Sequence, residues 1–528
     1  MKLLEKISFT DLDNIPQLIK DFLAGNIKDF QDESFNLRNV EDKIRAKKKY
    51  FSFETRETIS RILEKQMTAL SLSEKQSDNL RLISNQNTFT VTTGHQLNLF
   101  SGPVFFIYKI LQTIKTCDFL KKEFPAYQFV PIFWMATEDH DFEEINHFKT
   151  LDAYYEINER HGGYTGEISL SETIFIEHFE REFKNSVFGT ELILMMKEAY
   201  REGNTLAQAT RSLVNRLFSE FGLLMLDGNE ADLKRLMIPV FKDELNNNSL
   251  LKESRKNIDF LIKNYGKVQV NPREINLFYL SQTRNRIEFD GEKFNIVDTD
   301  LVFDNNQLMQ ELNAHPEKFS PNALMRPVLQ ETVLPNIMYI GGNAEIMYWF
   351  ELKDYFKSLQ LPFPILVPRN SMLWISEKTF NKIKKLELSP IDFLNDFQKT
   401  TDRKILQNNE IIKEIGQLEI LLKENFNQLK TTAELTEKSF GNLVKAEESR
   451  QLKSFERMKK RLLRAEKRKQ HELLFRLQKL YFTLNPDGIW QERVYNFSIF
   501  YADEGRTWLE TCLKEMDILH PNLLILEN

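Results

Sequence analysis

The sequence contains little or nothing of several features that define whole classes of protein. Among 528 residues it has two cysteines, Cys117 and Cys512, which are too few for a disulfide framework and are typical of a reducing compartment. Its 18 glycines exclude a collagen-like chain, which needs glycine at about every third position. No uncharged apolar run reaches the roughly 18 residues of a membrane-spanning helix, and the N-terminal segment lacks the apolar core of a signal peptide. We therefore expect a cytoplasmic protein that does not bind membranes.

The charge and composition are those of an ordinary folded protein. The formal net charge is −6, which is small for this length and does not indicate a nucleic-acid partner. Hydrophobic residues make up 41% and charged residues 28% of the chain, so disorder of the whole chain is excluded. The 42 phenylalanines supply bulky side chains for a large core.

Residues 89–136 alternate between strand-like and helix-like patterns. The run 89–93 is rich in β-branched residues and predicts a strand that ends at Gly94. Apolar residues at helical spacing follow over 104–119, and the apolar run 129–136 predicts a second strand. A strand, a helix and a strand in this order form a βαβ unit, which implies a parallel sheet.

Similar runs later in the chain extend this pattern. Three further strands are predicted at 223–226, 337–340 and 364–367. The helical segment 190–221 and a β-hairpin around an Asp-Gly pair at 286–294 differ in character. We therefore predict an α/β fold in which a parallel-sheet core occupies residues 1–377, with insertions at about 155–221 and 245–325.

Residues 378–484 contain few glycines and prolines and repeat apolar residues at heptad spacing. The first seam consists of Ile411, Ile415, Leu418, Leu422 and Leu429, with Asn425 as its polar member; the second begins with Phe455, Met458 and Leu462. We predict two long helices, joined near Gly441, that form an antiparallel coiled-coil hairpin about 50 Å long. Acidic residues are interspersed in its basic stretch, so self-association is favoured over nucleic-acid binding. Residues 485–528 are expected to return to the core.

The loop 94–103 lies between the first strand and the helix that follows it. Backbone N–H groups and the positive end of a helix meet at such a junction and bind phosphates. The loop has neither the Walker nor the GxGxxG motif, and a polar loop without a ligand remains the alternative. The candidates for nucleotide binding here and at the later strand-to-helix junction are Gly94, His95, Gln96, Ser101, Gly102, Lys109, Gly341 and Gly342.

A run of titratable residues follows the strand at 129–136, where open α/β sheets bind ligands. The candidates for catalysis are Glu138, Asp139, His140 and Asp141, and those for substrate binding are Glu143, Asn146 and His147. If the segment is helical, i,i+4 pairs such as His140 and Glu144 could hold a metal, but no HExxH motif is present. Acid–base chemistry or amine binding is favoured, and a structural network that caps a helix is the alternative.

A third segment, 325–331, adds candidates for substrate binding. Arg326 suits a carboxylate or a phosphate because its guanidinium can bind either group through two hydrogen bonds. Gln330 and Glu331 follow on the same segment. A fourth polar group, Gln491-Glu492-Arg493, comes directly after the predicted coiled coil, and a helix N-terminal network is its alternative interpretation.

These four segments, in order, resemble one known family. They read TTGHQLNLFSGPVFFIYK, VPIFWMATEDHDFEEINH, RPVLQETVLPNIMYIGGNAEIMYW and NPDGIWQERVYNF, and they are similar to the bacillithiol-biosynthesis enzymes proposed to add cysteine to glucosaminyl malate. The resemblance covers nearly the full length. It implies a Rossmann-like core, a coiled coil used for homodimerisation, and a ligase that forms an amide between the cysteine carboxyl and the sugar amine. His95 departs from the family, which usually has glutamine there.

The chemistry that the resemblance implies needs an activated carboxyl group, because a carboxylate and an ammonium do not condense appreciably in water. ATP, with Mg²⁺ accompanying it, is the simplest source, and no tightly bound metal is expected. Our hypothesis places the phosphates at the loop 94–103 with Lys109, an amine against Glu138, Asp139 and Asp141 with His140 as base, and the malyl carboxylate on Arg326. A nucleotidyl-transferase-like enzyme with another substrate, a non-catalytic coiled-coil scaffold and, last, a metal hydrolase are the alternatives.

Overall fold

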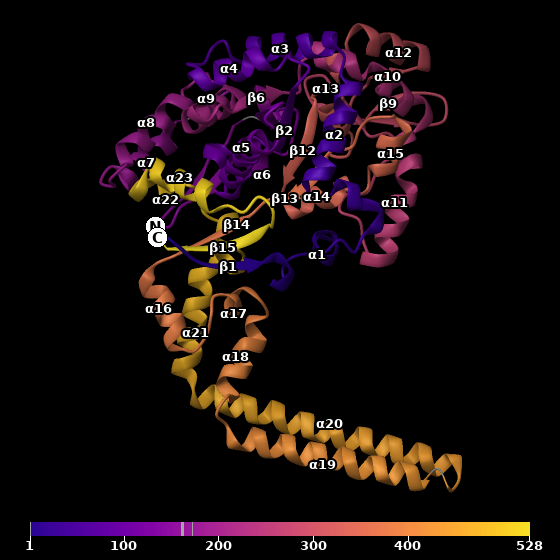
Figure 1. The fold of residues 1–528 in the computed structure, drawn as a ribbon, viewed down its shortest axis with the longest axis vertical. Coiled ribbons are helices and arrows are strands. Elements are labelled where there is room, and N and C mark those ends of the chain that lie inside the picture. Colours follow the sequence, from indigo (N-terminus) through magenta and orange to yellow (C-terminus); the bar gives the residue numbers. More distant parts are fainter. Residues whose placement is uncertain (1, 160–162, 172, 434, 528) are drawn as a thin grey trace. The chain divides into compact units, whose positions relative to one another are not determined.

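The computed structural model describes residues 2–159, 163–171, 173–433 and 435–527, and Figure 1 shows the path of the chain. The chain divides into two compact units. One consists of Met1–Trp374 with Gln491–Asn528, and the other of Ile375–Trp490. The first unit holds the sheets, and the second is built from helices.

The main sheet of the first unit has five strands in the order β13-β12-β2-β3-β6, and every neighbouring pair is parallel. The strands are β2 (Thr88–His95), β3 (Gln128–Met135), β6 (Leu224–Asp227), β12 (Asn336–Gly341) and β13 (Ile365–Pro368). All five runs predicted as strands form this one sheet. The prediction of a Rossmann-like core with a parallel sheet is therefore confirmed.

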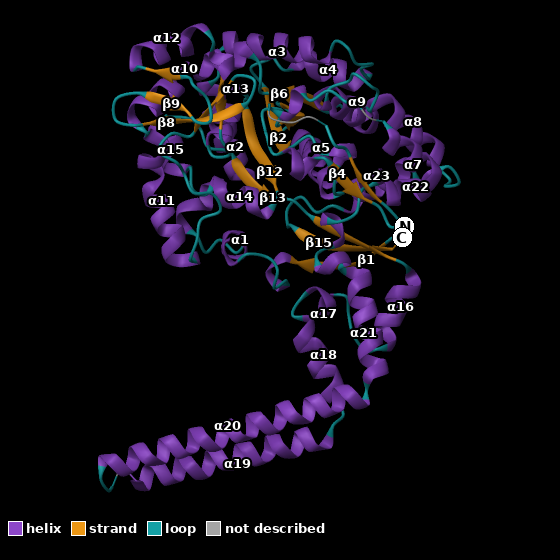
Figure 2. Cartoon of the chain, turned by 180° about the vertical axis from the view of Figure 1, so that it is seen from behind, coloured by secondary structure: helices purple, strands orange, loops and turns teal. Residues whose placement is uncertain are grey.

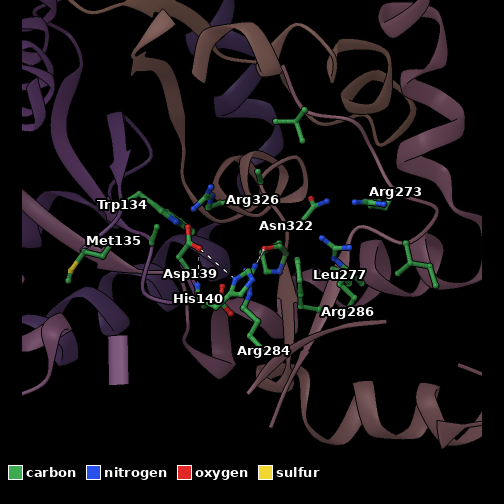
Figure 3. A pocket seen from close by; sticks show the side chains of 18 of the residues that line it. Trp134, Met135, Asp139, His140, Arg273, Leu277, Arg284, Arg286, Asn322 and Arg326 are labelled. Carbon is green, nitrogen blue, oxygen red and sulfur yellow. Dashed lines mark hydrogen bonds and ion pairs between the residues drawn. The ribbon is translucent and has the colours of Figure 1, made fainter. Parts of the chain in front are cut away.

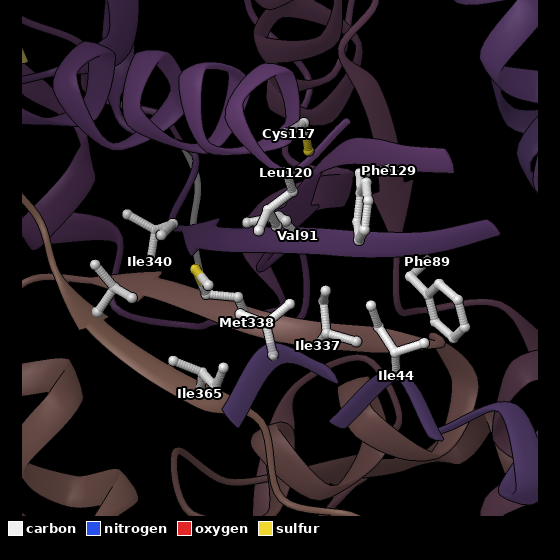
Figure 4. Packing of buried hydrophobic residues seen from close by; sticks show 12 residues of the cluster. Ile44, Phe89, Val91, Cys117, Leu120, Phe129, Ile337, Met338, Ile340 and Ile365 are labelled. Atoms are coloured by element: carbon white, nitrogen blue, oxygen red, sulfur yellow. The ribbon is translucent and has the colours of Figure 1, made fainter. Parts of the chain in front are cut away.

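Helices cover both faces of the main sheet. The helix α5 (Phe105–Glu123) packs on β2 and β3, and α2 (Leu37–Tyr50) packs on β12. Figure 4 shows Cys117 and Leu120 of α5 on one side of Val91 and Ile44 of α2 on the other side of the sheet. Burial on both faces explains why β3, β6 and β13 are apolar without alternation. Each buried Val, Ile, Leu or Phe of this cluster contributes about 1.5–3 kcal/mol to folding.

Two further sheets matter for the site and the core. One, the insertion sheet, is antiparallel throughout and has the order β10-β9-β8-β7-β11. Its strands are β7 (Leu277–Leu280), β8 (Arg284–Phe289), β9 (Phe294–Ile296), β10 (Val302–Phe303) and β11 (Phe319–Pro321). The pairing of β8 with β9 confirms the predicted hairpin. The other, smaller sheet, β1-β15-β14, joins β1 (Leu3–Ser8), β15 (Asn522–Glu527) and β14 (Ser371–Ile375), and in it β1 pairs with β15 in the antiparallel sense.

The connections of the first unit are mainly helical. They are α1 (Gln17–Leu23), α3 (Phe53–Met67), α4 (Glu74–Leu82), α6 (Phe142–Ile145), α7 (Ile174–Phe183), α8 (Gly189–Ala199), α9 (Leu206–Phe218), α10 (Ala231–Asn247), α11 (Ser249–Tyr265), α12 (Asn305–Ala314), α13 (Met325–Val333), α14 (Asn343–Trp349), α15 (Lys353–Ser358), α22 (Ser498–Glu504) and α23 (Arg506–Glu515), with the short hairpin β4 (His147–Lys149) and β5 (Tyr154–Glu156). In the part of the chain that the structure describes, no helix combines the length and the apolar composition needed to cross a membrane.

The second unit contains the predicted helical hairpin. Its helices are α16 (Glu377–Lys385), α17 (Ile391–Leu394), α18 (Phe397–Leu406), α19 (Glu410–Ala433), α20 (Lys438–Lys469) and α21 (His471–Leu484). Both views show α19 and α20 side by side (Figures 1 and 2). Gly441 lies inside α20, so the predicted position of the turn was wrong; α19 ends at Ala433 and α20 begins at Lys438.

The face of α19 that packs on α20 agrees with the predicted seam at Leu422 but differs from it at other positions. Phe426 and Ala433 are buried against Val444, with Leu422 beside them, whereas Leu418 and Leu429 are 55% and 44% exposed. Two apolar stripes run along α19 at nearly the same spacing. The stripe that contains Phe426 turns inward because this bulky side chain gains the most from burial.

Candidate functional site

The carboxyl ends of β2, β3 and β12 lie at one edge of the main sheet, and a polar segment follows each of them. The strand β2 ends at His95, β3 is followed by Glu138-Asp139-His140, and β12 leads into Gly342 before α14. Ligands of open parallel sheets bind at this edge. Two cavities lie there.

The first, the arginine cavity, has a volume of about 410 Å³ and contains four guanidinium groups (Figure 3). Among the described residues that line it, the arginines are Arg273, Arg284, Arg286 and Arg326, and the carboxylates are Glu138 and Asp139. The excess of positive charge indicates an anionic ligand.

The second, the His95 cavity, has a volume of about 300 Å³. Its lining includes Gly94, His95, Gln96, Gln330, Tyr339, Gly342, Glu345, Arg369 and Arg493. It shares Trp134, Ala136, Asp139 and Arg326 with the arginine cavity. One carboxylate and one guanidinium therefore stand in a wall common to both cavities.

Asp139 is held as a charged carboxylate. Its oxygens accept hydrogen bonds from Nε2 of Gln96 at 3.0 Å and from the backbone N–H of His140 at 2.8 Å. Burial by itself would raise the pKa of Asp139, but the positive charges of Arg326 and Arg284 and the Gln96 hydrogen bond bring it below its ordinary value. The group is therefore suited to hold an ammonium at neutral pH.

Arg326 extends from α13 into the common wall, and its guanidinium makes no hydrogen bond to any residue that the structure describes. Burial would lower the pKa of Arg326, but Tyr348, Asp139 and other acidic groups raise it above its ordinary value. A charged guanidinium without a hydrogen-bonded protein partner is free to bind a ligand.

His140 is positioned by Arg284. The guanidinium of Arg284 donates to Nδ1 of His140 at 3.0 Å, and it also donates to the hydroxyl of Ser320 and the carbonyl of Pro321. Burial and the charge of Arg284 lower the pKa of His140. Arginine N–H groups can only donate, so Nδ1 is the acceptor and the proton of the neutral ring lies on Nε2. In this arrangement His140 is a hydrogen-bond donor towards the site, which does not suit the hypothesis that it acts as a base.

His95 lies in the second cavity with a buried Nε2 that has no hydrogen-bond partner among the described residues. Its ring stacks on that of Phe106 at 5.0 Å. Burial, together with the charges of Lys109 and Arg369, lowers the pKa of His95 well below its ordinary value. A neutral imidazole nitrogen is therefore available to a ligand in this cavity.

Lys109 is bound to other residues of the protein. Its ammonium donates to both carboxylate oxygens of Glu345 at 2.8 Å and to the carbonyl of Gly94. Glu345 also accepts from the hydroxyl of Tyr339 at 2.6 Å and from the N–H of Gly342 at 3.1 Å. This network joins the ends of β2 and β12, and it occupies the ammonium that the sequence assigned to a phosphate.

Two guanidiniums at the far side of the His95 cavity come from segments distant in sequence. Arg369 donates to both oxygens of Glu492 at 3.0 and 2.7 Å, and both side chains are buried. Arg369 and Arg493 lie over the ring of Phe105, with centroid distances of 5.1 and 5.4 Å. The first of these arginines is rigidly fixed, and the second makes no hydrogen bond to a described residue.

The segment after β3 does not form a single helix, because α6 spans only Phe142–Ile145. The predicted i,i+4 pairs therefore do not share a helix face. Asp141 caps α6 by accepting from the N–H of Glu144, and Glu138 forms an ion pair with the buried Lys234. No group of three His, Cys, Asp or Glu side chains placed to hold a metal ion occurs among the described residues.

Several other candidates lie outside the linings of both cavities. They are Asp141, Glu143, Asn146, His147, Ser101, Gly102, Lys109, Glu331 and Gly341. Asn146 binds Glu156 and the carbonyl of Ile157 in the interior. Gly102 has φ +60°, and a Cβ there would lie 2.7 Å from Cβ of Asn98, so its role in the structure is the tight turn.

The sequence analysis missed four arginines and one lysine that shape the site, and it noted Arg493 in the fourth polar segment without giving it a role. Arg369 follows the strand β13, as other site residues follow their strands, so its position was a usable signal. Arg273, Arg284, Arg286 and Lys234 come from the insertion and from α10. Nothing in their local sequence indicates that they meet at a cavity.

Two family models together match nearly the whole chain, and they meet close to Trp374, although the second model also covers the residues 491–528 that belong to the first compact unit. Residues 4–370 match the family description "Bacillithiol biosynthesis BshC, N-terminal Rossmann-like domain", and residues 372–528 match "Bacillithiol biosynthesis BshC, C-terminal coiled-coil domain". A protein of Flavobacterium johnsoniae named "Putative cysteine ligase BshC" is 39% identical over 98% of this chain and 99% of its own. Proteins with the same name from Flavobacterium psychrophilum and Cytophaga hutchinsonii are 39% and 32% identical, over 98% and 95% of this chain and 97% and 95% of their own.

Proposed function

The chain is a ligase of the bacillithiol biosynthesis BshC family, and we propose that it joins the carboxyl group of cysteine to the amine of glucosaminyl malate. The observation that best supports this proposal is the wall shared by the two cavities. An amide ligase must hold an activated carboxyl next to an amine. Asp139 and Arg326 offer one charge of each sign at the boundary between two binding spaces.

The His95 cavity suits the phosphates of an activating nucleotide. Three guanidiniums, those of Arg326, Arg369 and Arg493, line it. Those of Arg326 and Arg493 make no hydrogen bond to a described residue and can each bind phosphate oxygens through two hydrogen bonds, whereas Arg369 is paired with Glu492. The neutral ring of His95 adds one more polar atom. ATP is therefore the energy source in this proposal, and Mg²⁺ enters with it, held mainly by phosphate oxygens.

The amine of the acceptor is placed at Asp139. In this scheme a carboxylate oxygen of cysteine first bonds to a phosphorus atom of ATP, and the P–O bond to the leaving pyrophosphate (for an adenylate) or ADP (for an acyl phosphate) breaks. The acceptor ammonium loses one proton to water, and its nitrogen then attacks the carbonyl carbon. The C–N bond forms, the C–O bond to the phosphate group breaks, and the departing phosphate group takes the second proton of the nitrogen. Arg326 stabilises the departing negative charge, and in this proposal the Nε2–H of His140 donates a hydrogen bond to the oxygen of the tetrahedral intermediate.

The activation step is tested by omitting ATP. Purified protein with cysteine, glucosaminyl malate, ATP and Mg²⁺ is expected to yield the amide in mass spectrometry, and the same mixture without ATP is expected to yield none. Cysteine-dependent exchange between ATP and pyrophosphate would identify an adenylate. Exchange that depends on a different carboxylic acid, with none for cysteine, would contradict the proposal and favour a carboxylate-activating enzyme with another substrate.

We further expect the protein to be a homodimer through the helical hairpin, because several apolar side chains of the hairpin remain exposed. These are Ile411, Leu418, Ile420, Leu421 and Leu429 of α19 and Phe440, Leu443 and Met458 of α20. The double variant Leu418→Lys/Leu421→Lys is expected to halve the mass measured by size-exclusion chromatography with light scattering. The control Gln417→Lys, at an exposed neighbouring position, should keep the dimer. A wild-type monomer, or a dimer in the double variant, would contradict this interface.

A further inference from the structure

We propose that the arginine cavity selects an acceptor that carries two carboxylates, and that Arg273 and Arg286 are the residues that recognise the second one. This inference rests on the proposed function only in naming the acceptor, glucosaminyl malate, whose malyl group is a dicarboxylate. The site itself is defined by side chains of the insertion, which the reaction scheme above does not use.

The charges that line the cavity do not balance. The carboxylate of Glu138 is paired with the ammonium of Lys234, which is fully buried, and the carboxylate of Asp139 faces the charges of Arg326 and Arg284. Arg273 and Arg286 lack a carboxylate partner among the described residues. Guanidiniums gathered in one cavity repel each other, and a ligand with two negative charges removes that cost.

The three arginines that the insertion contributes divide into one that is fixed and two whose guanidiniums are free. Arg284 is held by Ser320, Pro321 and His140, and its guanidinium stacks on the ring of Phe278 at 4.0 Å. The side chains of Arg273 and Arg286 are exposed, and neither guanidinium makes a hydrogen bond to a described residue. A free planar guanidinium can bind a carboxylate through two parallel hydrogen bonds.

The residues proposed to recognise the second carboxylate lie on a different side of the cavity from Asp139, where the amine of the acceptor is placed. In Figure 3, Arg273 and Asn322 lie on the side of the cavity away from Asp139 and Trp134. Arg284 and Arg286 come from the same strand, β8, two residues apart, so their side chains leave the same face of the strand. An acceptor with its amine at Asp139 therefore has its acidic end towards the insertion.

The first experiment measures binding without turnover, by calorimetry with L-malate and with L-2-hydroxybutyrate, in which a methyl group replaces the second carboxylate. We expect wild-type protein to bind L-malate about tenfold or more tightly than L-2-hydroxybutyrate. Arg273→Gln and Arg286→Gln should each remove most of this preference. The control Arg255→Gln makes the same change on the exposed face of α11, where Arg255 pairs with Asp259, and should keep it.

The second experiment measures amide formation with glucosaminyl malate. Arg273→Gln and Arg286→Gln should raise the KM for the acceptor about tenfold or more, with kcat and the KM for ATP within about twofold of wild type. An unchanged acceptor KM, or a rise in the KM for ATP instead, would overturn the proposal and assign the cavity to the nucleotide. If no amide forms but L-malate binding depends on Arg273 and Arg286, the proposed function fails while this site stands.

Discussion

Replacing Arg326 by glutamine is expected to lower kcat/KM for amide formation by about 10²–10³, the usual cost of losing one group that stabilises charge in a transition state. Arg326 lines both cavities, is charged, and has a guanidinium that makes no hydrogen bond to a described residue. Its removal therefore deprives a ligand of an interaction without breaking one inside the protein. The loss should be measured as initial rates by mass spectrometry, with far-ultraviolet circular dichroism confirming the fold.

A change in the pH profile would separate this role from a structural one. The charge of Arg326 stabilises the carboxylate of Asp139 and lowers its pKa. Without that charge the pKa of Asp139 rises, so the acidic limb of the rate profile should move to higher pH in Arg326→Gln. Arg326→Lys should keep the acidic limb in place but recover only part of the rate, because an ammonium lacks the two-pronged geometry. A rate within about threefold of wild type in Arg326→Gln would contradict the placement of the transition state at this wall.

Replacing Glu331 by alanine is expected to lower the free energy of unfolding of the first unit by about 3–5 kcal/mol, since it leaves a buried charge without its partner. The sequence analysis assigned Glu331 to substrate binding. The structure places it in the interior, where its carboxylate lies 2.6 Å from Nζ of Lys47 and both side chains are 0% exposed. The same carboxylate accepts hydrogen bonds from Gln330 at 3.0 Å and from Asn336 at 2.6 Å.

The measurement is urea unfolding followed by tryptophan fluorescence. Trp134, Trp349, Trp374 and Trp508 belong to the first unit, so the signal reports mainly on that unit. The double variant Lys47→Met/Glu331→Leu removes both charges and should recover most of the loss. Asp42→Ala, which removes the exposed partner of Arg45 on the same helix, should cost no more than about 1 kcal/mol. Full stability of Glu331→Ala, with a raised KM, would restore the substrate role.

The hydrogen bonds around Glu331 explain why the sequence analysis took this residue for part of a binding site. Asn336 also accepts a hydrogen bond from the hydroxyl of Thr92 at 2.9 Å, so α2, α13, β2 and β12 are joined by one buried polar network. Polar residues beside a strand end can thus serve the interior as well as a ligand. Whether such a residue joins a buried network or binds a ligand depends on the face of the helix on which it lies.

The sequence by itself determined the elements and the edge at which the site forms. Buried strands such as β3 are continuous apolar runs, heptad spacing marks α19 and α20, and an Asp-Gly pair marks the β8–β9 hairpin, because each of these patterns reflects the geometry of a few neighbouring residues. The rule that ligands bind beyond the carboxyl ends of parallel strands then indicated Asp139 and His95, and the chemistry of its guanidinium indicated Arg326.

Only the tertiary structure decided which charges are free. Lys109 and Arg326 both appear in the sequence as cations near a strand end, but Glu345 neutralises the first and no described residue hydrogen-bonds the second. Likewise, the face of α19 that turns inward and the meeting of the insertion's arginines at one cavity depend on contacts between segments far apart in the chain. Periodicity is a local property, whereas the partner of a charge is set by how distant segments pack, so the chemistry of the site was decided only when the chain had folded.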